Sequence, residues 1–162
     1  MCSGVLHHTK DKKKGFEVIL NYVKKNGIII IGLYNKYGRI RTYIRGWIYK
    51  IFGFKFLRFT DPVLREIESN DKAKINSWIR DQYHHPVESA HSFNEVIGWF
   101  KENNVDFINS YPSCKITHDN NYEYFKKTGV GTIYERIFQQ ITMIFSRLGG
   151  EGGLFIFIGR KK

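Results

Sequence analysis

The stretch Ile28-Ile29-Ile30-Ile31-Gly32-Leu33 decides the fold class of this chain. Continuous β-branched residues are typical of a strand that is covered on both faces, as in a parallel sheet. Helically spaced apolar residues precede it between Lys10 and Lys25, where Thr9 is the expected cap and Asn26-Gly27 the left-handed stop. Met1 to Leu6 has the pattern of the end of an earlier strand. The sequence therefore predicts a βαβ unit and an α/β fold.

A helical insertion is expected after this second strand. Arg39 to Phe52 carries apolar residues at helical spacing with basic residues between them, which predicts a basic amphipathic helix. Asp61-Pro62 opens a second, short helix that runs through Ile67, and a third runs from Lys72 to about Arg80. We expect residues 36–91 to form this insertion, as a lid within one domain that spans residues 1–162.

The remaining chain returns to an α/β pattern. Ser92 and Glu95 form a capping box at the start of a helix that ends near Asn104. Three further elements are expected: a strand over Val105 to Ser110, a helix over Thr132 to Leu148, and a final strand over Leu154 to Ile158.

Composition and charge limit the classes of protein. The chain has 162 residues, 42% of them hydrophobic, which suits one folded domain rather than a disordered tail. Its net charge of +11 would attract anionic partners such as nucleic acid or anionic lipid. A general bias of the sequence toward Lys, Asn and Ile is the stronger explanation of that charge, so we do not expect nucleic acid as the partner. Two cysteines, no secretory signal and no apolar run of membrane-spanning length predict a cytoplasmic protein without a transmembrane segment.

Ordered blocks of sequence carry a resemblance to a known family. Cys2-Ser3-Gly4-Val5-Leu6-His7-His8-Thr9, followed by Asn26-Gly27 and the strand through Tyr34-Asn35, resembles the segment from the fourth to the fifth strand of class I S-adenosylmethionine-dependent methyltransferases. The blocks Tyr34–Arg39, Asp81–Pro86 and Gly149–Gly153 are similar to a bacterial subgroup with a helical insertion after the fifth strand. The resemblance covers nearly the whole chain. It implies a partial Rossmann-like methyltransferase sheet of the last four strands, the final one antiparallel.

The same resemblance implies that part of the enzyme is missing. The family's glycine-rich loop after the first strand, and the acidic residue that holds the ribose, cannot be placed in this chain. Gly149 to Gly153 precedes a strand and no helix follows it, so it lacks the context of a nucleotide cradle. We therefore expect a C-terminal half that is inactive by itself, with weak or absent binding of S-adenosylmethionine, and whose partner is a missing N-terminal half.

The candidate site follows from the rule that ligands bind beyond the carboxyl ends of the strands of an open α/β sheet. A histidine suits the role of base near neutral pH when the acceptor must lose a proton, although it can equally cap a helix or pack. The resemblance implies two sets of residues. The candidate catalytic residues are His7, His8 and Asn35. The candidate cofactor-binding residues are Ser3, Gly4, Leu6 and His7.

The acceptor side is expected in the polar and aromatic residues that follow the second strand and close the insertion. The candidate substrate-binding residues are Tyr34, Tyr37, Gln82, Tyr83, His84 and Glu88. A polar loop whose histidines make only turn and cap hydrogen bonds is the competing interpretation. A metal site on His84, His85, Glu88 and His91 is disfavoured, because Pro86 breaks the helical registration between them, and we expect no metal.

The resemblance implies methyl transfer from S-adenosylmethionine to a small-molecule or lipid acceptor. The helix over Arg39 to Phe52 fits a lid, a packed helix or a membrane-surface element, and the last would imply a lipid or quinone acceptor. A different class of function is a non-catalytic basic binding module for RNA or an anionic membrane, on a degenerate methyltransferase scaffold.

Overall fold

The computed structural model describes residues 1–3, 6, 9–83, 89–116, 123–145 and 153–162. The chain is α/β and divides into two compact units, one of Met1–Gly38 with Val87–Lys162 and one of Arg39–Pro86. We call them the sheet unit and the helical unit and describe each by itself. No helix in these ranges is both long enough and apolar enough to cross a membrane.

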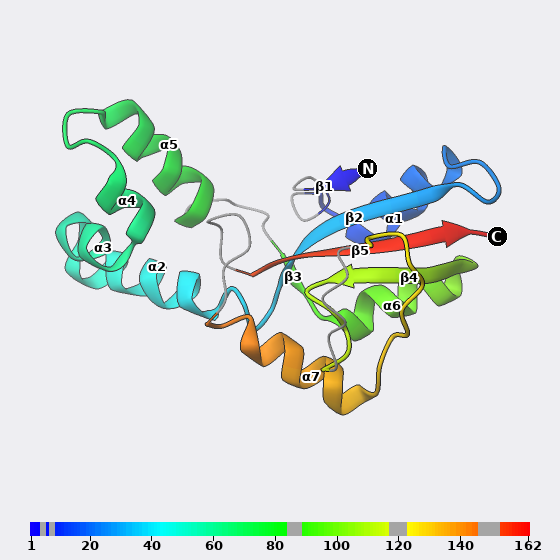
Figure 1. Ribbon diagram of the computed structural model, residues 1–162. Coiled ribbons are helices and arrows are strands. Elements are labelled where there is room, and N and C mark those ends of the chain that lie inside the picture. The colour runs from blue at the N-terminus through cyan, green and yellow to red at the C-terminus, as the bar shows by residue number, and fades with distance from the viewer. Residues whose placement is uncertain (4–5, 7–8, 84–88, 117–122, 146–152) are drawn as a thin grey trace. The chain divides into compact units, whose positions relative to one another are not determined.

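The sheet unit contains one mixed sheet, in which the longer strands β2, β5 and β4 lie side by side (Figure 1). The strand order is β1-β2-β5-β4, and β3 pairs with β2 off this path. β1 and β3 are parallel to β2, whereas β5 is antiparallel to both β2 and β4. The mixed sheet confirms the expected α/β class, and β3 is an addition that the sequence did not predict. The strands are β1 (Cys2–Ser3), β2 (Ile28–Asn35), β3 (Ala90–His91), β4 (Val105–Tyr111) and β5 (Leu154–Lys161).

Three helices accompany this sheet: α1 (Lys12–Asn21), α6 (Phe93–Glu102) and α7 (Ile133–Thr142). The predicted cap of α1 was wrong. Asp11 accepts the backbone N–H of Lys14 at 3.0 Å, while the Thr9 hydroxyl donates to the carbonyl of Leu6 at 2.7 Å. Thr9 lies two residues before the cap, and its hydroxyl is engaged with the Leu6 carbonyl instead of with the first turn of α1.

The capping box at α6 is confirmed, whereas the predicted helix stop at Asn26-Gly27 was wrong: α1 already ends at Asn21, and Asn26 adopts the left-handed conformation in the turn before β2. The Ser92 hydroxyl accepts from the Glu95 N–H at 3.2 Å, and the Glu95 carboxylate accepts from the Ser92 N–H at 3.4 Å. Asn26 has φ of +63°, a conformation that asparagine tolerates better than most residues. Both signals are local, so they could be recognised without knowing the fold.

One face of the sheet holds the main hydrophobic core. Ile29, Ile31 and Leu33 of β2 are buried there, beside phenylalanines of β5. Phe16 of α1 stacks on Phe100 of α6 with ring centroids 5.7 Å apart, so α1 and α6 cover the same face. Strand β2, with its carboxyl end at Asn35, is thus fixed by a continuous apolar layer.

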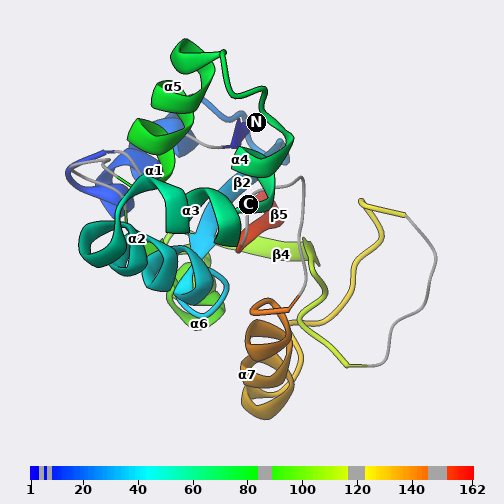
Figure 2. The same ribbon diagram turned by 90° about the vertical axis from the view of Figure 1, so that its left-hand side faces the viewer.

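The helical unit contains α2 (Ile40–Phe52), α3 (Phe54–Thr60), α4 (Pro62–Glu66) and α5 (Lys72–Tyr83). Figures 1 and 2 show α2 at one side of this unit and α5 at the other, with α4 between them. Helix α2 confirms the expected amphipathic helix, whereas α3 was not predicted. Gly53 has φ of +78° and allows the chain to end α2 and start α3 at once.

A small aliphatic core and one buried carboxylate hold the helical unit together. Asp61 caps α4 through one carboxylate oxygen. Its other oxygen accepts from Trp78 Nε1 at 2.9 Å and from the Tyr83 hydroxyl at 2.6 Å. Burial, and next the hydrogen bond to Asp61, raise the pKa of Tyr83 far above its usual value. The aliphatic core residues are Leu57, Leu64, Ile67, Ile75 and Ile79.

Candidate functional site at the carboxyl end of β2

Asn35 is the last residue of β2 and its side chain is completely buried. Its Oδ1 accepts the backbone N–H groups of Tyr37 at 3.0 Å and Gly38 at 3.3 Å. Its Nδ2 donates to Gln140 Oε1 at 2.9 Å and to the carbonyl of His91 at 3.3 Å. The amide therefore fixes the turn that follows β2, and the polar groups of its side chain are engaged within the fold.

Gln140 of α7 is the second member of this buried cluster. Its Oε1 also accepts the N–H of Phe93, the first residue of α6, at 2.8 Å. Its Nε2 donates to the carbonyl of Arg136 one turn earlier, at 3.0 Å. Gln140 thus joins α7, the start of α6 and the end of β2. The sequence analysis missed it, because its partner Asn35 is 105 residues away.

His91 of β3 lies directly beside Asn35 in the register of the sheet and is buried. Its Nδ1 is 2.8 Å from Glu95 Oε1, and its Nε2 is 2.8 Å from the Ser89 hydroxyl. A carboxylate can only accept, so the ring proton lies on Nδ1 and Nε2 is left to accept the Ser89 proton. The indole of Trp99 meets the imidazole edge-on, with centroids 5.2 Å apart.

The electrostatics of Glu95 favour its charged form. Burial raises the pKa of the Glu95 carboxyl, whereas its hydrogen bond to His91 and the nearby positive charges lower it. The lowering effects together outweigh burial, so the pKa lies below the ordinary value of 4.5. One of these charges is Lys36, whose Nζ lies 3.5 Å from Glu95 Oε2. A charged Glu95 holds His91 in the tautomer that leaves Nε2 basic.

Ser89, His91 and Glu95 together form a hydroxyl–imidazole–carboxylate chain at the carboxyl end of β2. This arrangement can move a proton from a hydroxyl to the imidazole, because the carboxylate stabilises the resulting positive charge. His91 was considered only as a metal ligand in the sequence analysis, and Glu95 only as a cap. The two residues are four apart in the sequence, but His91 lies on β3 and Glu95 on α6, so no helical periodicity pairs them.

The predicted cofactor residues that the structure describes lie on β1 and just after it. Leu6 is buried in the core against α1, and its carbonyl accepts both the N–H and the hydroxyl of Thr9. Ser3 of β1 lies beside Gly32 of β2, where an added Cβ would collide with the Ser3 hydroxyl. The remaining predicted residues of this group, Gly4, His7 and His8, lie outside the described residues.

The predicted substrate residues are divided between the two units. Tyr34 is buried in β2 and Tyr37 is half-buried in the turn after Asn35. In the helical unit, Gln82 Oε1 accepts from Arg39 Nη1 at 2.8 Å, and Tyr83 is bonded to Asp61. Asn35, Tyr34 and Tyr37 are thus brought together, whereas Gln82 and Tyr83 support the fold of the helical unit. His84 and Glu88 lie outside the described residues.

A close backbone approach locks the turn after β2. The N–H of Asn35 donates to the carbonyl of Gly153 at 2.6 Å, and a Cβ added to Gly38 would collide with the Gly153 backbone. Gly153 has φ of +89°, which favours glycine. This last residue of the glycine block therefore serves the turn and the start of β5.

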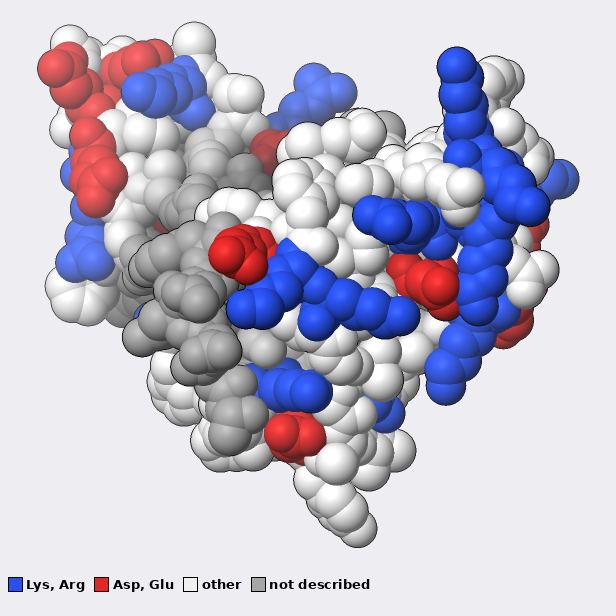
Figure 3. All heavy atoms as spheres, turned by 45° about the vertical axis from the view of Figure 1, so that its right-hand side comes forward, with Lys and Arg blue, Asp and Glu red and all other residues white. Residues whose placement is uncertain are grey.

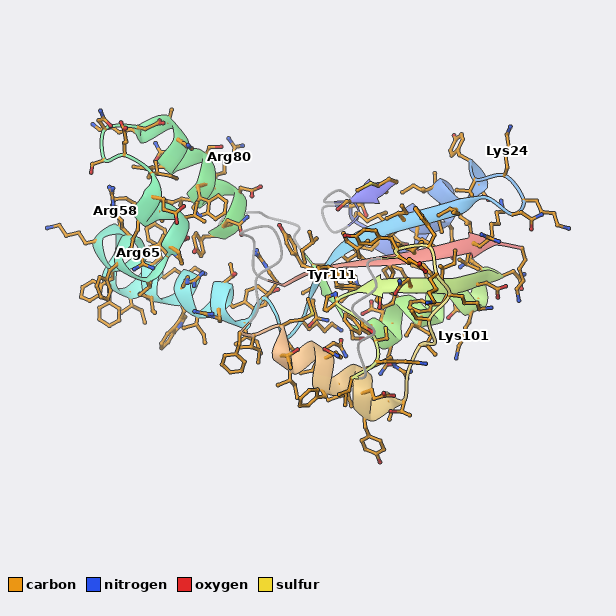
Figure 4. All side chains as sticks on the ribbon, in the orientation of Figure 1. Lys24, Arg58, Arg65, Arg80, Lys101 and Tyr111 are labelled. Carbon is orange, nitrogen blue, oxygen red and sulfur yellow. The ribbon has the colours of Figure 1, made fainter. Side chains whose placement is uncertain are left out.

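A second concavity in the sheet unit lies away from this cluster. A hollow of about 270 Å³ is lined by residues of α6, β4 and the segment 127–130, among them Lys101 and Thr128. Figure 4 labels Lys101 on this side and Tyr111 at the other end of β4. Since β4 is parallel to β2, the hollow belongs to the amino ends of these strands, away from Asn35.

Surface charge and metal ligands add little to the site. In Figure 3, Lys and Arg side chains form a row down the right-hand side of that face and a second row near its centre, with Asp and Glu side chains beside both. Within the described ranges, no group of three His, Cys, Asp or Glu side chains is placed to hold a metal ion.

A scan against protein-family models finds no model that matches this chain. Interpretation of the site therefore depends on its geometry and on the sequence blocks described above.

Proposed function

We propose that this chain is the C-terminal part of an S-adenosylmethionine-dependent methyltransferase that modifies a small-molecule or lipid acceptor. One observation carries the proposal: β5 is antiparallel to its neighbours β2 and β4, in a sheet where α1 connects the parallel strands β1 and β2. A reversed final strand of this kind is what the resemblance of the sequence blocks implies. The chain's proposed partner is an N-terminal half that carries the glycine-rich loop and the ribose-binding acid.

The described residues fit only part of the cofactor. β1 and β2 are parallel, so their carboxyl ends point toward the same edge of the sheet, as a ligand at a strand-end crevice requires. However, Leu6 is a core residue and the Asn35 amide is already engaged, so these side chains provide no contacts for an adenosine. We therefore derive no step that passes through S-adenosylmethionine and assign roles only to the chain's own groups.

Asn35 and Gln140 act as positioning residues in this proposal. They hold the turn after β2 rigid, so that the backbone of residues 35–38 keeps one shape against the ligands. Rigid positioning is the main contribution of a protein to a displacement between two bound partners and accounts for up to about 7–11 kcal/mol of a barrier.

His91 is the described group best suited to accept a proton from an acceptor hydroxyl. Its Nε2 faces a hydroxyl, Ser89, and its Nδ1 faces the carboxylate of Glu95. An acceptor hydroxyl could replace Ser89 as the donor to Nε2. His7 and His8 keep their predicted role as alternative bases.

The experiment compares two proteins in a calorimetric titration with S-adenosylhomocysteine. One is the present chain, and the other is the product of the whole reading frame, including any codons upstream of Met1. We expect an in-frame glycine-rich loop upstream, saturable binding by the longer product, and weak binding by the present chain.

Two results would overturn the proposal. A longer product that lacks a glycine-rich loop and does not bind S-adenosylhomocysteine would remove the methyltransferase assignment. Micromolar binding by the present chain would contradict the division of the cofactor site between two halves. Circular dichroism of both proteins distinguishes a failure to bind from a failure to fold.

A further inference from the structure

The segment from Arg39 to Thr60, which forms α2 and α3, combines basic charge with exposed apolar side chains. It contains no Asp or Glu. Lys50 and Lys55 are exposed on it. Its basic residues are Arg39, Arg41, Arg45, Lys50, Lys55 and Arg58.

The apolar stripe of α2 faces away from the core of its own unit. Ile44, Trp47 and Ile51 follow helical spacing and are 52%, 67% and 53% exposed. The opposite side of the helix faces the core, where Tyr49 packs against the aliphatic cluster and Gly46 lies against Tyr83. The apolar side chains whose helical spacing would usually face a core are therefore exposed on α2.

Helix α3 extends this surface. Phe52 and Phe56 have ring centroids 5.1 Å apart and are both more than half exposed. Figure 4 shows ring-bearing side chains on the outer side of α2 and α3, away from α4 and α5. We call Ile44, Trp47, Ile51, Phe52 and Phe56 the α2–α3 apolar surface. Contiguous exposed apolar surface of this kind marks a site of interaction.

We propose that the α2–α3 apolar surface docks onto an anionic lipid membrane without crossing it. An interfacial helix buries an apolar face at the boundary of the acyl chains while Lys and Arg meet anionic headgroups. The exposed Arg41, Lys50 and Lys55 of the acid-free segment supply those cations, whereas Arg39 is buried against Gln82.

Transfer of Ile44 and Ile51 into hydrocarbon is favourable, and these two side chains offer no ring for a base to stack on, so they favour lipid over RNA. The rings of Trp47, Phe52 and Phe56 suit either partner, and the RNA measurement below distinguishes the two.

Docking stands apart from the methyltransferase proposal, because it needs neither cofactor nor acceptor. In combination with that proposal, and resting on it, docking would present the strand-end site to an acceptor carried in the membrane. Vesicle binding is measured without S-adenosylmethionine, so each proposal can fail while the other stands.

The test is co-sedimentation of the chain with two kinds of vesicle: phosphatidylcholine alone and phosphatidylcholine with phosphatidylserine. We expect binding to the anionic vesicles to be at least about tenfold tighter and to weaken with added salt. The variant Trp47→Gln/Ile51→Gln/Phe56→Gln should lose about tenfold or more of this binding, because less apolar area is buried. Circular dichroism should show unchanged helix content, since these side chains are exposed.

A matched control lies on α7, which also carries exposed apolar residues. The variant Tyr134→Gln/Phe138→Gln/Ile141→Gln removes comparable side chains outside the acid-free segment and should bind vesicles as the parent does. Three results would overturn the proposal: no binding to anionic vesicles, equal loss in both variants, or a triple α2–α3 variant that binds as the parent does. The proposal would also be wrong if the surface instead mediated self-association in analytical ultracentrifugation or binding to a polyuridine RNA.

Discussion

The two units use their apolar residues in opposite ways. In the sheet unit, β2 buries Ile29, Ile31 and Leu33 beneath α1 and α6. In the helical unit, the longest helix exposes Trp47 and Ile51 and contributes little to its own small core. The apolar residues of the sheet unit thus hold the end of β2 in place, whereas those of α2 in the helical unit form exposed surface.

The largest expected effect separates a buried ring from an exposed one. Phe93 is fully buried and its ring lies 5.0 Å from Phe155, so Phe93→Ala should cost about 3–5 kcal/mol of unfolding free energy. Trp47→Ala should cost within about 0.5 kcal/mol, because its side chain is exposed. Urea unfolding followed by circular dichroism measures both. Equal losses would mean that α2 is packed and would break the comparison.

The next largest loss of stability is expected from removal of Asp61, the buried carboxylate beside the small aliphatic core of the helical unit. Asp61→Ala removes the cap of α4 and leaves Trp78 Nε1 and the Tyr83 hydroxyl without their acceptor. We expect a loss of about 2–3 kcal/mol. Asp71→Ala, which removes an exposed bond to the Lys74 N–H, is the matched control and should cost about 1 kcal/mol. Urea midpoints of the two variants should differ, and similar midpoints would deny Asp61 its central role.

The raised pKa of Tyr83 predicts how the helical unit responds to base. The folded state holds the Tyr83 proton more tightly than the unfolded state, so its stabilisation is complete below the unfolded pKa of about 10. It is lost as pH rises from there toward the folded pKa. The fall in urea midpoint above about pH 10 should be smaller in Tyr83→Phe than in the parent. Tyr134→Phe, which changes an exposed ring on α7, should keep the parent's fall.

A smaller effect is expected in acid at the strand-end site. The pKa of Glu95 is lower in the folded state, so its contribution is present above the ordinary value of 4.5 and is lost as pH falls through the folded pKa. Glu95→Gln should flatten the stability profile in that window only slightly, because the carboxyl is partly exposed. Glu102→Gln, at an exposed residue paired with Lys13, is the control. A steeper acid loss in Glu95→Gln would contradict the assigned sign.

Local signals explain which parts of the fold could be predicted. Three of them act within a few residues: the β-branched run of β2, the left-handed turn residue Asn26 and the Ser92–Glu95 capping box. Strand β3 has only two residues and no periodicity of its own, so it exists only through its pairing with β2. A single sequence cannot show such long-range pairing.

The candidate site shows the same limit more strongly. Asn35 was predicted because it ends a recognisable strand. Its partner Gln140 was not, because a polar residue on an amphipathic helix such as α7 is expected to face solvent. His91 and Glu95 were visible as residues, yet their hydrogen bond needed the turn between β3 and α6. The exposure of the apolar side chains of α2 could not be predicted either. The helical period shows that a helix has an apolar face, but not whether another element covers that face.

The most direct test of the central claim is a nuclear magnetic resonance titration of the ¹⁵N-labelled chain with millimolar S-adenosylhomocysteine. The account predicts weak binding that shifts the amide signals at the carboxyl ends of β1 and β2, at Ser3, Leu6, Asn35 and Lys36. The signals of Lys101 and Thr128, at the hollow by the amino ends of the strands, should stay in place. An unchanged spectrum, or shifts confined to the hollow, would contradict a methyltransferase site at the carboxyl end of β2.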